Sequence, residues 1–135
     1  MHIPFVDLKA QYLSIQSEMD NAISSIISNT SFIGGPAADA FEKSYGEFMG
    51  MKHMIACANG TDSLEILLVA MGIQPGDEVI GVAAGFPTTV NPILQFGAIP
   101  VFVDVDIATH NIDVTKIEAA ISPKTKAIML AHSLG

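Results

Sequence analysis

The chain has 135 residues, of which 50% are apolar and 15% are charged, a composition that supports an ordinary globular domain. Its formal charge of −8, from six Lys and Arg against fourteen Asp and Glu, argues against a nucleic-acid partner because a phosphate backbone attracts basic surfaces. There is no apolar run near the roughly 18 residues of a membrane span and no signal-peptide layout, so we expect a soluble, cytoplasmic protein without a membrane partner.

The first fifty residues have helical rather than strand patterns. Apolar residues recur at steps of three and four over 8–26, which predicts one long helix ending near residue 28. This stripe suits packing against a partner subunit, and packing on the chain's own sheet explains it as well. Residues 31–36 are expected to form a loop, and a second helix begins at Pro36 and stops at Gly50. Its aromatic residues are Phe41, Tyr45 and Phe48.

From residue 51 onward, short apolar runs alternate with helical segments. The candidate strands are 53–58, 78–83, 99–104 and 126–131, and the candidate helices are 61–71, 87–97 and 113–121. Apolar strands separated by helices indicate a mostly parallel sheet that is covered by helices on both faces. We therefore predict an α/β fold, with a helical segment over 1–50 and βα units over 51–135.

The junction between the first expected strand and its helix carries Gly60, Thr61 and Asp62. The first N–H groups of a helix have no partner within it and lie at the positive end of its dipole, so a phosphate is a natural occupant. The same residue types also cap helices that bind nothing, so this pattern leaves both interpretations open.

A second candidate site residue is Phe86, in the loop that follows the strand expected at 78–83. Ligands of open α/β sheets bind outside the carboxyl ends of the strands, where this loop and Thr61 are both expected. The Phe86 ring could stack on a planar heterocycle whose phosphate is held at the helix start. Alternatively, the ring folds back on the core.

Five segments in order carry a family resemblance that covers the whole chain. They are 3–8, 32–36 with Phe41 and Glu42, 59–64, 72–80 and 124–128. The chain resembles the N-terminal part of the DegT/StrS-type sugar aminotransferases, pyridoxal-phosphate enzymes with the large domain of the aspartate-aminotransferase (type I) fold. The resemblance implies a homodimer that transfers an amino group from a donor such as glutamate to a nucleotide-linked keto-sugar, in polysaccharide or deoxysugar biosynthesis.

The resemblance also implies site residues. Gly60, Thr61 and Asp62 match the segment that the family uses for the phosphate of pyridoxal 5'-phosphate, through backbone N–H groups and the Thr hydroxyl. Phe86 matches the aromatic residue that stacks on the pyridine ring, and the loop at 32–36 matches a segment near the dimer interface and active site.

Part of the chain departs from this branch of the family. Residues 85–92 and 131–135 look more like the sugar 3-dehydratases, which use pyridoxamine phosphate and have histidine in place of the Schiff-base lysine. In the family, that lysine and the acidic partner of the pyridine nitrogen both lie beyond the position of Gly135. We therefore expect no catalytic residue here and no transamination by this chain alone; a truncated, non-catalytic paralogue is a further alternative. The basic residues are expected to be solvated: Lys9, Lys43, Lys52, Lys116, Lys124 and Lys126.

The remaining candidate residues give weaker signals. Cys57, between alanines of the expected strand, is interpreted as a small buried residue rather than a reactive thiol. Asp104 and Asp106 could do acid–base work, but turn and capping roles are the simpler interpretation, and His132 could face the pocket. No metal site is expected, because no two histidines have helical i, i+4 spacing. An unpaired sheet edge and uncovered apolar faces predict oligomerisation.

Overall fold

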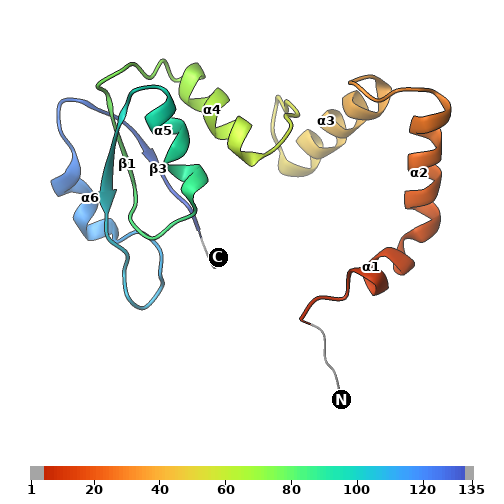
Figure 1. The fold of residues 1–135 in the computed structure, drawn as a ribbon, viewed down its shortest axis with the longest axis horizontal. Coiled ribbons are helices and arrows are strands. Elements are labelled where there is room, and N and C mark those ends of the chain that lie inside the picture. The colour runs from red at the N-terminus through yellow and green to blue at the C-terminus, as the bar shows by residue number, and fades with distance from the viewer. Residues whose placement is uncertain (1–4, 133–135) are drawn as a thin grey trace. The chain divides into compact units, whose positions relative to one another are not determined.

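The computed structural model describes residues 5–132, and the chain divides into two compact units, Met1–Ala56 and Cys57–Gly135. The first unit contains the helices α1 (Leu8–Ser14), α2 (Gln16–Ser28) and α3 (Pro36–Met49), coloured red to yellow in Figure 1. No helix within residues 5–132 is long and apolar enough to cross a membrane.

The prediction of one continuous helix over residues 8–26 was wrong at Ile15, where α1 ends and α2 begins. Ile15 has φ −124° and ψ 15°, outside the helical region. The hydroxyl of the preceding Ser14 donates a hydrogen bond to the Gln11 carbonyl at 2.7 Å. Such a local bond bends helices because it competes with the regular backbone pattern, and apolar periodicity carries no sign of it.

Helix α3 has the limits that its flanking residues predict. Pro36 occupies the first helical turn, and Gly50 follows the last turn with φ 65°, a left-handed conformation that glycine adopts without strain. The expected aromatic stripe is present: the rings of Phe41 and Tyr45 stack with centroids 5.4 Å apart, and Phe48 lies 6.2 Å from Tyr45.

The strand expected at 53–58 is absent from the described structure, so that prediction was wrong. A segment becomes a strand only when a neighbouring backbone pairs with it, and within residues 5–132 no backbone pairs with this one. As a result Cys57 is exposed, contrary to the expectation of burial.

The second unit is the predicted α/β arrangement (Figure 1). Its three strands are all parallel, in the order β2-β1-β3. They confirm three of the four expected strands to within two residues at each end. The elements are α4 (Gly60–Ala70), β1 (Glu78–Val82), the short 3-10 helix η1 (Pro87–Thr89), α5 (Asn91–Gln95), β2 (Ile99–Val103), α6 (Val114–Ala120) and β3 (Thr125–Met129).

Helices cover both faces of this sheet, as the sequence predicts. On one face Leu68 of α4 and Ile93 of α5 pack with Val79 of β1. On the other face Ile80 of β1 belongs to a second cluster, against which Ile117 of α6 packs. Alternate residues of the central strand thus supply both cores, which is why its apolar run is continuous.

The helix expected over 87–97 is divided into η1 and α5. The cause is Pro92, which has no N–H to donate to a carbonyl one turn earlier, so a regular helix cannot run through this point. The proline instead lies in the first turn of α5, where a missing donor costs nothing.

Candidate functional site

The start of α4 presents two backbone N–H groups that are free to bind a ligand. Asn59 precedes the helix in an extended conformation, and its side-chain oxygen accepts a hydrogen bond from the Asp62 N–H at 2.9 Å. The Ser63 N–H donates to the Asn59 carbonyl at 3.1 Å. The N–H groups of Gly60 and Thr61 have no acceptor among the described residues. Two adjacent donors at the positive end of an eleven-residue helix form a suitable cradle for an anion.

Of the three residues predicted to hold a phosphate, Asp62 differs from the other two. Its N–H is engaged by Asn59, so it is not free in this structure. Its side chain is an acidic group in the first turn of α4, where a negative charge interacts favourably with the positive end of the helix dipole. A phosphate contact from Asp62 stays a prediction. Sequence reasoning gave Asn59 no role of its own, although an Asn directly before a helix is a recognised capping signal.

Phe86 follows β1 and has an open ring. Its side chain is 71% exposed, so of the two alternatives left by the sequence, the structure favours a ring that is available for stacking. The Phe86 carbonyl accepts hydrogen bonds from the Thr89 N–H at 3.0 Å and the Thr89 hydroxyl at 2.8 Å, which fixes its backbone. A Cβ added at Gly85 would lie 3.2 Å from Cγ1 of Val82, so a larger residue there requires a small shift of the Val82 side chain.

Helix α4, which begins at Gly60, and η1, which follows Phe86, lie on one side of the sheet. Helix α4 contacts η1, which begins directly after Phe86, and also contacts α5. Both α4 and α5 pack on the face of the sheet that carries Val79. The helix that begins at Gly60 and the segment that carries Phe86 are therefore neighbours, as a shared ligand requires.

The two aspartates after β2 act as turn residues. One carboxylate oxygen of Asp106 accepts hydrogen bonds from the N–H groups of Ala108 and Thr109 and from the Thr109 hydroxyl. The Thr109 N–H makes the largest contribution to a lowered pKa of Asp106, followed by the Thr109 hydroxyl. Asp104 accepts a hydrogen bond from the Val105 N–H at 2.8 Å. These bonds confirm the turn interpretation over the acid–base one.

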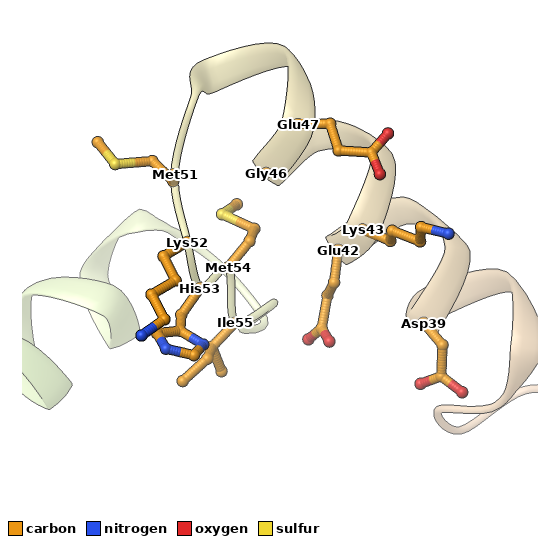
Figure 2. A pocket seen from close by; sticks show the side chains of 10 residues that line it. All are labelled: Asp39, Glu42, Lys43, Gly46, Glu47, Met51, Lys52, His53, Met54 and Ile55. Atoms are coloured by element: carbon orange, nitrogen blue, oxygen red, sulfur yellow. The ribbon is translucent and has the colours of Figure 1, made fainter.

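The other candidate residues are solvent-exposed. All six lysines are exposed, as expected, and Lys116 lies 3.1 Å from the carboxylate of Asp113. His132 is also exposed, three residues after the end of β3. A separate hollow of about 490 Å³ lies in the first unit, between α3 and the segment that follows it (Figure 2). It contains none of the predicted site residues.

A parallel sheet with helices on both faces defines the chain as an α/β protein. Solved structures show that its fold is that of the pyridoxal-phosphate aminotransferases. A DegT DnrJ EryC1 StrS aminotransferase from Brucella abortus matches it with a TM-score of 0.88 and 40% identity, over 94% of this chain and 36% of that one. A GDP-4-keto-6-deoxy-D-mannose-3-dehydratase from E. coli, with bound hydrated PLP, matches with a TM-score of 0.75 and 30% identity, over 80% of this chain and 29% of that one.

The chain belongs to the DegT/DnrJ/EryC1/StrS aminotransferase family, which it matches over residues 13–135. Lipopolysaccharide biosynthesis protein RfbH of Salmonella typhimurium is 55% identical over 72% of this chain and 24% of its own length. UDP-2-acetamido-2-deoxy-3-oxo-D-glucuronate aminotransferase of Pseudomonas aeruginosa is 42% identical over 94% of this chain and 35% of its own length. The chain thus spans between a quarter and about a third of these two relatives.

Proposed function

We propose that the chain is part of a nucleotide-sugar aminotransferase and that it holds the phosphate and the ring of pyridoxal 5'-phosphate. The observation that carries this proposal is the free N–H pair of Gly60 and Thr61 on a helix that contacts η1, the segment directly after Phe86. Membership of the family and similarity to the Pseudomonas aeruginosa enzyme support the same assignment.

Each of these residues has a distinct role in the proposal. The N–H groups of Gly60 and Thr61 and the Thr61 hydroxyl donate hydrogen bonds to the phosphate, whose charge the helix dipole stabilises. The Phe86 ring stacks on the pyridine ring and keeps water from that side. When bound, the cofactor supplies the electron sink that amino transfer needs. The keto-sugar, the amino donor, the homodimer and the cytoplasmic location also belong to the proposal, and rest on the family.

Cofactor affinity of the full-length enzyme tests the phosphate and ring contacts. Thr61→Ala and Phe86→Ala should each weaken binding of pyridoxal 5'-phosphate, the latter by roughly twofold to tenfold, which is the value of one aromatic stacking contact. Phe48→Ala, at an exposed phenylalanine of α3, is the matched control and should leave the dissociation constant unchanged. Unchanged binding in both site variants would rule out the proposed contacts of the Thr61 hydroxyl and the Phe86 ring.

A sugar 3-dehydratase that uses pyridoxamine phosphate is the second candidate. The similarity to the E. coli dehydratase supports it, and so does the resemblance of residues 85–92 to that branch. Both activities need the same phosphate and ring contacts, so the binding experiment does not separate them. Product analysis with a nucleotide-linked 4-keto-sugar does: an amino sugar indicates an aminotransferase, and a 3-deoxy sugar indicates a dehydratase.

A further inference from the structure

Glu42 of α3 makes a hydrogen bond to a backbone group fourteen residues away. Its Oε1 atom accepts from the N–H of Ala56 at 2.7 Å. A bond from an amide to an ionised carboxylate is about twice as strong as one between neutral groups. Neither the phosphate cradle nor the aromatic ring described above makes use of this residue.

A second contact holds the same returning segment one helical turn further along α3. The chain reverses after Gly50, and the Met51 N–H donates to the Gly46 carbonyl at 2.8 Å. Gly46 is buried, and a Cβ added there would lie 3.3 Å from Cβ of Met54. Met54 therefore packs on bare helix backbone, which keeps the returning segment close to α3 (Figure 2).

The spacing of the two contacts fits a segment that runs extended along the helix. Glu42 and Gly46 are four residues apart on α3, a rise of about 6 Å. Met54 and Ala56 are two residues apart in the returning segment, about 6.6 Å if it is extended. The two lengths agree, so one strand-like stretch matches the helix at both points.

Only Cys57 and Ala58 separate Ala56 from Asn59, the residue that caps α4. We propose that Glu42 is a positioning residue: by binding Ala56 it restricts the conformations of the segment that leads into the phosphate cradle. Holding a loop in its binding conformation raises affinity because less entropy is lost when the ligand binds. This inference rests on the proposed function, because it assigns the ligand of Gly60 and Thr61 as a phosphate.

The hollow in Figure 2 supplies a matched control. Its lining includes three carboxylates: Asp39, Glu42 and Glu47. Glu47 lies on the same helix as Glu42 and carries the same charge, but its carboxylate makes no hydrogen bond within residues 5–132. Substituting Glu47 therefore changes the charge of the hollow without releasing the returning segment.

The experiment uses the full-length enzyme with Glu42→Ala, Glu42→Gln and Glu47→Gln. We expect Glu42→Ala to speed hydrogen–deuterium exchange in a peptide covering 54–62 of the cofactor-free protein. It should also weaken binding of pyridoxal 5'-phosphate about tenfold, as expected for loss of a bond to a charged acceptor. Glu42→Gln should give smaller changes in both, because its side-chain oxygen still accepts from Ala56. Glu47→Gln should match the wild type.

Two results would overturn the inference: wild-type exchange and affinity in Glu42→Ala, or equal losses in Glu47→Gln. If Glu42→Ala does not fold, Glu42→Asp serves in its place: its carboxylate keeps the charge but is one methylene too short to reach Ala56, so wild-type exchange and affinity in that variant refute the role. Failure of the proposed function has a different signature, since Thr61→Ala and Phe86→Ala would then both leave binding unchanged. If Thr61→Ala weakens binding and Glu42→Ala does not, only the role of Glu42 is refuted.

Discussion

Replacing Leu68 of α4 by alanine tests the packing of the second unit. Leu68 is 1% exposed and lies in the cluster that includes Val79 and Ile93. Replacing a buried leucine by alanine lowers the free energy of unfolding by about 2–5 kcal/mol, because apolar burial is lost and a cavity is left behind. The neighbouring Leu67 is 55% exposed, so Leu67→Ala on the same helix should cost about 0.5 kcal/mol or less. The free energy of unfolding of a domain is only about 5–15 kcal/mol, so Leu68→Ala removes a large part of it.

Urea unfolding followed by far-ultraviolet circular dichroism measures this difference, because the chain has no tryptophan to report by fluorescence. The free energy of unfolding falls by about 1–3 kcal/mol per molar urea, so Leu68→Ala should lower the urea midpoint by roughly 1–3 M. The midpoint of Leu67→Ala should shift by less than about 0.5 M. Equal shifts in the two variants would show that α4 does not present Leu68 to the sheet and would refute the described packing.

Three further changes probe local features. Asn59→Ala removes the cap of α4 and should cost about 1 kcal/mol in the same unfolding assay, whereas Asn59→Ser should restore most of it; no loss in the alanine variant would contradict the capping bond. Asp106→Ala should be less stable than the wild type at pH 7. Because the folded pKa of Asp106 lies below the unfolded value of about 3.9, this difference should vanish as the pH falls through the folded pKa, and a constant difference down to pH 2 would argue against it. Gly97→Ala should lower the melting temperature, because Gly97 has φ 69° and an added Cβ would lie 3.2 Å from Pro75; an unchanged value would mean that the turn can move.

The strands of the second unit could be predicted because their local signals agree. The central strand β1 is buried on both faces from its second residue, so residues 79–82 are continuously apolar, and a Pro-Gly turn at Pro75 precedes its start. The segment at 53–58 has the same apolar pattern, but pairing depends on a neighbouring backbone and not on the segment itself. Composition alone therefore could not distinguish a strand from an extended segment held by a side chain.

The sequence could predict which loops carry the candidate site residues, but not the hydrogen bonds within them. The sequence placed Gly60, Thr61 and Phe86 beyond strand ends. Phe86 lies four residues after the end of β1, whereas no strand precedes Gly60 among the described residues. The sequence could not show that Asn59 engages the Asp62 N–H, because that bond depends on the backbone angles before α4. The hydrogen bond between Glu42 and Ala56 joins residues that are fourteen apart in the sequence. It depends on tertiary structure, which the periodicity of apolar residues does not predict.

The amino ends of the three strands are fastened together by main-chain hydrogen bonds. The Gly76 N–H donates to the Gly97 carbonyl, the Ile99 N–H to the Asp77 carbonyl, and the Glu78 N–H to the Lys124 carbonyl. None of these bonds involves a side chain, so the alignment of the strands tolerates extensive exchange of residue types. Loops at the opposite edge can therefore change in sequence while the frame beneath them keeps its register, provided that a residue with a fixed role, such as Phe86, is retained.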